Sequence, residues 1–285
     1  MLNYYLYRVG QFLVTHLPLK MAYAIAVFCS DVHFIFADKD RLATKENLRV
    51  IFPEKSIKEI RKIRIQMFRN FAKYLVDFFR FEKIDKEFIK KNIRIENIQY
   101  FNDAIAKGKG AIILTAHMGN WELGGIVIAL LGYPFWAVAL PHKEKKVDEL
   151  FNHQRESKGV KVIPLNKAVR SSLDVLKKNE LVALVGDRDF TENGIIVNFF
   201  GKPALFPDGA AAFSLKTGAP IVPGFMVRNP DDSFTLRIEK PLEFTPTGDK
   251  KKDLLNFINK YKAIFEDYIR RYPDQWYMFR RFWKE

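Results

Sequence analysis

Short apolar runs alternate with longer amphipathic stretches from residue 93 onward. Seven runs rich in Val, Ile and Phe predict strands, at 111–116, 135–140, 160–164, 181–186, 195–199, 221–227 and 234–239. The stretches between several of them predict helices, at 102–107, 122–131, 146–157, 167–177 and 208–217. This alternation is typical of an α/β protein with a mostly parallel sheet flanked by helices. The turn at 229–232 predicts a late hairpin, so we expect the sheet to be mixed.

The first 54 residues follow a different pattern. Residues 21–37 are apolar apart from Asp31 and His33, and this run is shorter than the ~20 apolar residues usual for a membrane-spanning helix. Tyrosines at 4–7 precede it, as expected at a lipid headgroup boundary. A helix that lies in the membrane surface is therefore favoured over a single span. An ordinary core helix is the remaining alternative.

The same segment divides the chain into two parts. We expect residues 1–54 to form a helical, membrane-associating segment and residues 55–285 to form a catalytic domain. Basic residues at 39, 41, 45 and 49 follow the apolar run. If the run spans a membrane, these residues would hold its C-terminal side in the cytoplasm.

Two long helices and a tail complete the expected architecture. The apolar positions of 56–81 recur at three- and four-residue intervals, and Ser56 with Glu59 forms a capping box. Its basic face could touch anionic lipid or could simply be solvated. A closing helix at 249–271 precedes the tail 272–282, whose aromatic and basic residues suit a membrane interface.

Composition narrows the classes of partner. Nearly half of the residues (48%) are hydrophobic, so a sizeable core can form. The single cysteine, Cys29, excludes an intramolecular disulfide and a cysteine-based metal site. The formal charge of +14 favours an anionic partner, namely nucleic acid, anionic lipid or an acidic carrier protein; a lysine-rich proteome is the plain alternative. No RNA-binding motif, dinucleotide fingerprint or phosphate-binding loop is present, so we expect no nucleic acid partner.

The motif H-M-G-N-W-E at 117–122 carries the strongest indication of chemistry. It stands where the predicted strand 111–116 ends and a helix begins, and ligands of open α/β sheets bind at such carboxyl ends. His117 can act there as a general base. Glu122 can cooperate with it only if a turn separates the two, because residues five apart on a continuous helix point about 140° apart.

The same motif predicts a helix start. Asn120 is a candidate N-cap, with Trp121 in the first turn that follows. The free N–H groups of such a helix start can bind an anion. Asn120 and Trp121 are therefore candidates for substrate binding.

Polar groups also follow the predicted strand 181–186. Asp187 or Asp189 could orient His117 or raise its basicity, and Arg188 lies between the two acids. The alternative is that the three charged residues form only an ion network within a loop.

Further candidates for substrate binding lie elsewhere in the chain. Arg155, late in the helix 146–157, can bind phosphate through its bidentate fork or can be a plain surface arginine. Phe200 and Gly201 follow the run 195–199 and suit the wall of an apolar groove or, equally, the edge of the core.

With these residues in view, the chain resembles the bacterial lipid A biosynthesis acyltransferases, the lauroyl/myristoyl transferase family within the wider lysophospholipid/glycerol-phosphate acyltransferase group. The resemblance covers nearly the whole chain and rests on the motif at 117–122, Arg155, 187–189, F-F-G at 199–201, T-G-A-P at 217–220 and Trp276 with Arg280 and Arg281. Asp187-Arg188-Asp189 followed by Phe190 and Thr191 is also similar to the actinobacterial relatives that acylate phosphatidylinositol mannosides.

The resemblance implies the reaction and its setting. An acyl group passes from a thioester of acyl carrier protein or coenzyme A to a hydroxyl of a lipid A precursor or related glycolipid, at the cytoplasmic face of the bacterial inner membrane. His117 is the implied base, with Glu122, Asp187 or Asp189 as its partner, and Arg155 holds a phosphate. The backbone N–H groups at 119–121 are candidate donors to the oxyanion of the reacting thioester. No metal and no further cofactor is expected, since a thioester is already activated.

Other functions remain open from the sequence. The acceptor can be a phosphatidylinositol mannoside or a glycerolipid instead. A basic peripheral membrane protein without enzymatic activity is the alternative from another class.

Overall fold

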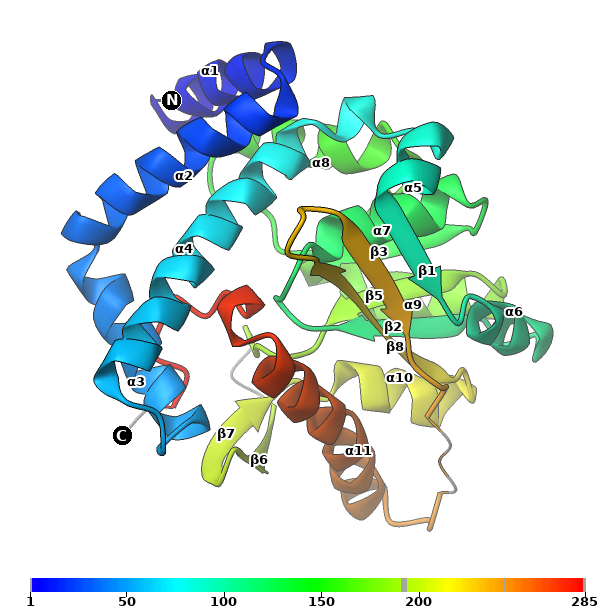
Figure 1. Ribbon diagram of the computed structural model, residues 1–285. Coiled ribbons are helices and arrows are strands. Elements are labelled where there is room, and N and C mark those ends of the chain that lie inside the picture. The colour runs from blue at the N-terminus through cyan, green and yellow to red at the C-terminus, as the bar shows by residue number, and fades with distance from the viewer. Residues whose placement is uncertain (1, 191–193, 243, 245, 284–285) are drawn as a thin grey trace.

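A seven-stranded sheet forms the centre of the computed structural model, which describes residues 2–190, 194–242, 244 and 246–283. The strand order is β1-β9-β8-β2-β5-β3-β4 (Figure 1). Strands β8, β2, β5, β3 and β4 run parallel, and β9 and β1 run the opposite way because β9 pairs antiparallel with β8. The expected mixed, mostly parallel sheet is thus confirmed. The strands are β1 (Ile93–Glu96), β2 (Ala111–Thr115), β3 (Phe135–Ala139), β4 (Lys161–Pro164), β5 (Leu181–Val185), β8 (Ile221–Arg228) and β9 (Phe234–Ile238).

Helices cover both faces of this sheet. They are α1 (Leu2–His16), α2 (Leu19–Phe36), α3 (Asp38–Ile51), α4 (Ile57–Phe79), α5 (Lys86–Asn92), α6 (Gln99–Ala106), α7 (Trp121–Leu130), α8 (Lys145–Glu156), α9 (Ala168–Lys177), α10 (Gly209–Thr217) and α11 (Lys250–Arg271). Side chains of α6, α7 and α8 share one core with the sheet, and side chains of α9, α10 and α11 share the other. The expected closing helix is therefore α11.

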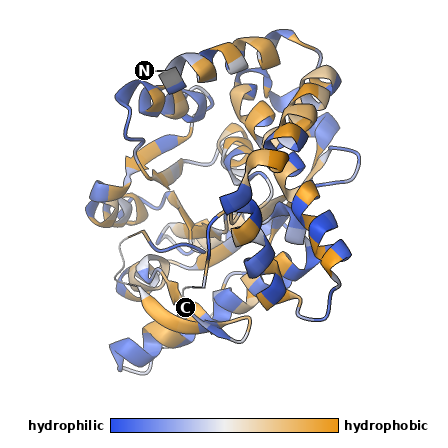
Figure 2. Ribbon diagram, turned by 90° about the vertical axis from the view of Figure 1, so that its left-hand side faces the viewer, coloured by the Kyte–Doolittle hydropathy of each residue, from blue (hydrophilic) through white to orange (hydrophobic). Residues whose placement is uncertain are grey.

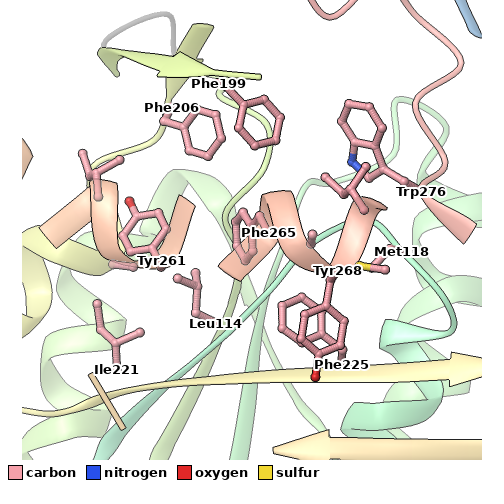
Figure 3. Close-up of a cluster of buried hydrophobic side chains, with 14 of the residues drawn as sticks. Leu114, Met118, Phe199, Phe206, Ile221, Phe225, Tyr261, Phe265, Tyr268 and Trp276 are labelled. Carbon is pink, nitrogen blue, oxygen red and sulfur yellow. The ribbon is translucent and has the colours of Figure 1, made fainter. Parts of the chain in front are cut away.

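The two cores follow from the pleat of the central strand. Ile113 and Leu114 are neighbours on β2 and point to opposite faces of the sheet, because side chains alternate along a strand. Leu114 lies in the core that contains Phe265 and Tyr268 of α11 (Figure 3). Its aromatic neighbours fix α11 against the sheet.

One expected strand of the sheet lies elsewhere. Residues 195–199 form β6 (Ile195–Phe199), which pairs antiparallel with β7 (Lys202–Phe206) in a separate hairpin, so their expected place in the central sheet is wrong. Phe199 and Phe206 of this hairpin pack toward α11 (Figure 3). Burial alternates along β6, as in a strand with one solvated face. Neither β7, which contains a proline, nor the short edge strand β1 is among the sequence-predicted strands.

The N-terminal helix α2 packs along α4 through apolar side chains, such as Ala22 and Phe34, and also through polar ones. Asp31 of α2 forms two hydrogen bonds of 2.7 Å with Arg69 of α4. The outer side of α2 carries an apolar stripe instead, consisting of Met21, Ile25, Phe28, Val32, Ile35 and Phe36. Figure 2 shows hydrophobic stretches along the helices on this side of the molecule. Within the described part of the chain, α2 is the one helix whose length and composition would let it cross a membrane.

Two basic residues of α4 are engaged in ion pairs with other elements. Arg69 is bound by Asp31, and Lys73 forms an ion pair of 2.7 Å with Asp232 in the β8–β9 turn. The expected capping box of Ser56 and Glu59 is present at the start of the helix. The boundary expected after residue 54 falls in the turn between α3 and α4.

A buried polar network joins α2 to the sheet. Asp77 of α4 accepts hydrogen bonds from the hydroxyl of Tyr23 on α2, from Arg228 Nη2 on β8 and from Asn120 Nδ2 at 3.0 Å. Both charged side chains are almost fully buried. This pairing compensates the desolvation of the guanidinium and fixes four segments of the chain together.

Replacing Asp77 tests this network. Asp77→Ala leaves the Arg228 guanidinium buried without its closest carboxylate, so we expect the free energy of unfolding to fall by about 3 kcal/mol or more. Denaturant titration in mild detergent measures it. Asp267→Ala is the control, because its ion pair with Arg271 is exposed and should contribute less than ~1 kcal/mol. Equal losses in the two variants would contradict the assignment.

Candidate active site

The loop between β2 and α7 holds His117 at the carboxyl edge of the sheet. Gly119 has a φ of +59°, and a Cβ atom there would lie 2.0 Å from the Met226 carbonyl oxygen, so only glycine fits. The N–H of Gly119 donates to the Gln275 carbonyl and that of Asn120 to the Met226 carbonyl, each at 2.8 Å. The loop is therefore fixed between β8 and the segment after α11.

His117 is paired with a buried carboxylate. Its Nδ1 lies 2.6 Å from Asp187 Oδ1, and the other oxygen of Asp187 accepts a hydrogen bond of 2.9 Å from Trp276 Nε1. Asp187 has no exposed surface, whereas 16% of the His117 side chain is exposed. A carboxylate can only accept here, so Nδ1 carries the proton and Nε2 keeps its lone pair.

The surroundings of Asp187 keep its charge. Burial alone raises the pKa of this carboxyl, but His117, Arg188 and the Trp276 hydrogen bond outweigh burial and hold the pKa well below its usual range. Because the pKa of Asp187 is lower in the folded state than in the unfolded state, its ionised form stabilises the fold at any pH above the ordinary aspartate pKa. That contribution is lost only as the pH falls toward the folded-state pKa.

Glu122 has a different partner from the one that its spacing suggested. Arg155 Nε and Nη2 bind the two oxygens of Glu122 at 2.9 and 2.6 Å, and Arg155 Nη1 donates to Asn152 Oδ1 at 3.0 Å. The structure therefore pairs Asp187, not Glu122, with His117. It also buries Arg155 in an ion pair between α7 and α8 instead of leaving its fork open for phosphate. The expected roles of Glu122 as partner and of Arg155 as phosphate ligand are corrected accordingly.

Asn120 is a structural residue of the loop. Its Oδ1 accepts from the Leu123 N–H at 3.1 Å, which confirms the N-cap, and its Nδ2 donates to Asp77. Because its amide is buried, hydrogen-bonded through both polar atoms and outside the cavity lining, Asn120 positions the loop rather than contacting substrate. Trp121 stacks on Tyr74 with ring centres 4.6 Å apart and lies edge-on to His117.

Of the backbone N–H groups at 119–121 that are expected as oxyanion donors, one remains a candidate. The N–H groups of Gly119 and Asn120 already have carbonyl acceptors. The Trp121 N–H has no acceptor among the described residues, so it is the surviving backbone candidate.

Two of the remaining predicted residues line the cavity, and two do not. Asp189 accepts a hydrogen bond from the Gly194 N–H at 2.8 Å, and Arg188 donates to the Tyr277 carbonyl. Both line the cavity beside His117. Phe200 and Gly201 form the β6–β7 turn, outside the described lining. The Phe200 ring packs 4.5 Å from the Phe199 ring, so this pair belongs to the edge of the core.

A largely apolar cavity of about 580 Å³ opens beside His117. Strands β3 and β5 pair only as far as Ala137 and Ala183, and the ends beyond, including Val138 and Leu184, line the cavity. Its apolar lining comes from both faces of the sheet and includes Ile113, Leu114, Ile128, Phe135, Val138, Leu184, Phe213 and Met226. The catalytic candidate thus stands at the opening of an apolar chamber.

Sequence reasoning missed two contributors to the site. Trp276 orients Asp187, and Tyr74 supports Trp121 from α4. Trp276 belongs to the aromatic tail noted in the sequence, but no local pattern links it to an acid so distant in the chain. In the described part of the chain, no group of three or more His, Cys, Asp or Glu side chains could hold a metal ion.

Comparison with known proteins finds relatives that are named as acyltransferases. The family model described as bacterial lipid A biosynthesis acyltransferase matches residues 1–285. A phosphatidylinositol mannoside acyltransferase of Mycolicibacterium smegmatis is 28% identical over 75% of this chain and 70% of its own length. Its counterpart from Mycobacterium tuberculosis is 31% identical over 54% of this chain and about half (51%) of its own length.

More distant relatives align over longer stretches. A lipid A biosynthesis palmitoleoyltransferase of Escherichia coli K12 is 26% identical over 87% of this chain and 80% of its own length. A solved structure, the 1-acyl-sn-glycerophosphate acyltransferase of Thermotoga maritima, has a TM-score of 0.40 and 15% identity, covering 89% of this chain and 98% of that one.

The class of protein follows from the site and these relatives together. A histidine that can take a proton from a hydroxyl lies next to a chamber suited to hydrocarbon, and the family model and the sequence relatives are named for acyl transfer. The chain is an O-acyltransferase. Because the family model matches the full length of the chain, it belongs to the bacterial lipid A biosynthesis acyltransferase family.

Asp187→Asn tests the partner of His117. The amide can donate to Nδ1 and so favour the tautomer with the proton on Nε2, which cannot act as a base. We expect kcat to fall by roughly 100-fold or more with the fold retained. Steady-state acyl transfer in detergent measures it, with Asp103→Asn, an exposed aspartate of α6, as control. Wild-type turnover in Asp187→Asn would contradict the pairing as a catalytic feature.

Proposed function

We propose that this protein transfers a fatty acyl group from an acyl thioester, carried by acyl carrier protein or coenzyme A, to a hydroxyl of a lipid A precursor or a related glycolipid. The observation that supports this most is that the His117–Asp187 pair stands at an apolar cavity of about 580 Å³. That volume lies within the range of roughly 300–1,000 Å³ typical of small-molecule sites. Its apolar lining suits the acyl chain.

The reaction requires one proton to move twice. His117 Nε2 takes the proton of the acceptor hydroxyl as the oxygen attacks the thioester carbonyl carbon. The tetrahedral intermediate then collapses, the C–S bond breaks, and the departing thiolate takes the proton back from the imidazolium. The Asp187 carboxylate stabilises the transient positive charge on His117 and keeps the ring oriented.

No metal and no further cofactor is needed in this proposal, since the thioester supplies the activated acyl group. The Trp121 N–H is the backbone donor available for the developing oxyanion.

The proposal names the class of acceptor, which is a glycolipid with a free hydroxyl. The mycobacterial relatives are named for phosphatidylinositol mannoside and the Escherichia coli relative for lipid A. A phosphatidylinositol mannoside is the second candidate acceptor. It is favoured by the higher identity to the mycobacterial proteins, although that match is shorter.

We further propose that α1 and α2 lie on the cytoplasmic surface of the inner membrane. Helix α1 also carries exposed apolar side chains, namely Tyr5, Leu6, Val9, Phe12 and Leu13. Each stripe follows helical spacing, and the polar residues Tyr23 and Asp31 of α2 face α4. This arrangement supports a helix lying in the interface, because a span would have to leave α4 and give up those contacts. The positive net charge favours an anionic lipid surface.

Removing the imidazole tests the function directly. We expect His117→Ala to lower turnover roughly 10²–10⁴-fold, because base catalysis contributes about that much. Release of free carrier thiol and mass spectrometry of the acylated lipid report the reaction. His153→Ala on the exposed face of α8 is the control and should keep wild-type turnover. A fully active His117→Ala protein would exclude this histidine as the base.

Two exposed phenylalanines test the membrane proposal. Phe12 and Phe28 have exposed fractions of 60% and 69%. Replacing both with serine should weaken sedimentation with phosphatidylglycerol vesicles at least about tenfold, since a buried phenylalanine contributes roughly 1.5–3 kcal/mol. Activity in detergent should be kept.

Ile196→Ser is the matched control, because Ile196 is equally exposed (69%) but lies on the β6–β7 hairpin. Unchanged sedimentation of the Phe12/Phe28 double variant would refute the assigned membrane face.

A further inference from the structure

Arg188 places an incompletely paired positive charge in the wall of the cavity. Its Nη2 donates to the Tyr277 carbonyl, and its Nε is buried without an acceptor in the described part of the chain. Burial lowers the pKa of this guanidinium, and although Asp187 raises it, Arg280 lowers it further. A desolvated cation with an unused donor is stabilised when an anion binds.

A second arginine approaches the same place from the C-terminal segment. The guanidinium carbon of Arg280 lies 5.3 Å from the centre of the Phe190 ring, and that ring lies 6.3 Å from the His117 ring. Arg280 is exposed and has no ion pair among the described residues. Its neighbour Arg281 differs, because it binds Glu46 at 2.5 and 2.9 Å.

We propose that Arg188 and Arg280 form a phosphate-binding subsite at the mouth of the cavity, beside His117. The proposal rests on the proposed function and deepens it, since both substrates of that reaction can carry phosphate. The shared chemistry is a phosphate ester, either of the phosphopantetheine arm common to acyl carrier protein and coenzyme A, or of a phosphorylated glycolipid headgroup.

The two guanidiniums suit phosphate for electrostatic reasons. Two like charges near each other repel, and an anion carrying up to two negative charges between them removes that repulsion. The planar fork of arginine binds phosphate oxygens through charge-assisted hydrogen bonds. Arg155, the arginine that its position in the sequence singles out for phosphate, has its fork occupied by Glu122. Phosphate recognition is therefore assigned to Arg188 and Arg280 instead.

Arg280→Gln tests the subsite without disturbing a buried residue, and Arg281→Gln is the matched control with the same loss of charge next to it. Both are assayed with two donors, the acyl thioesters of phosphopantetheine and of pantetheine, and with acceptors that carry or lack a phosphate. We expect Arg280→Gln to raise the KM of one phosphate-bearing substrate roughly tenfold with kcat nearly unchanged. The penalty should disappear for the same substrate without its phosphate.

One substrate should show the rise in KM only when it carries its phosphate, and that substrate identifies the source of the phosphate. An Arg280→Gln protein with wild-type KM values, or with the same penalty for phosphate-free substrates, would overturn the subsite.

A binding measurement separates this proposal from the proposed function. Calorimetric titration with the non-hydrolysable thioether analogue of acyl-phosphopantetheine, and with the phosphorylated acceptor alone, requires no turnover. Loss of affinity in Arg280→Gln, but not in Arg281→Gln, supports the subsite even if the wild-type protein transfers no acyl group. Equal affinity of wild type and Arg280→Gln for both probes contradicts it.

Discussion

The site depends on one buried carboxylate. Asp187 has no exposed surface, and it stays ionised because His117 and Trp276 donate to its two oxygens. The bond to His117 fixes the tautomer and leaves Nε2 toward the cavity. The bond to Trp276 fixes the segment after α11 against the same loop. Glu122 cannot replace Asp187, because its two oxygens are held by Arg155. Base, carboxylate and C-terminal segment therefore form a single unit.

The N-terminal helix α2 is tied to that unit through polar contacts, in addition to small apolar clusters that it shares with α4. Tyr23 of α2 and Asn120 of the histidine loop bind the same carboxylate, Asp77. Because Tyr23 and Asp31 face α4, most of the large apolar side chains of α2, such as Phe28, lie on its outer side. These contacts with α4 explain how a helix that is apolar enough for a membrane remains part of the folded body.

Much of the fold could be predicted from local pattern, and less of the site. Neighbouring residues alone predict the strand before His117, the N-cap at Asn120 and the hairpin at 229–232. The structure confirms all three. The partner of His117 is not local. The spacing of Glu122 suggested one acid, but the start of α7 turns that side chain toward Arg155. Likewise, the alternating pattern of β6 shows a strand without showing which strand it pairs with, since pairing is decided by tertiary packing.

The tautomer of His117 is the most direct test of the central claim. The chain has five histidines, and heteronuclear NMR of nitrogen-labelled histidine, assigned with a His117→Gln variant, distinguishes the two ring nitrogens. The account predicts that in the neutral ring the proton sits on Nδ1, shifted by its hydrogen bond to a carboxylate, and that Nε2 is unprotonated. A neutral ring with its proton on Nε2 would contradict it, because the atom facing the cavity could then accept no proton from a lipid hydroxyl.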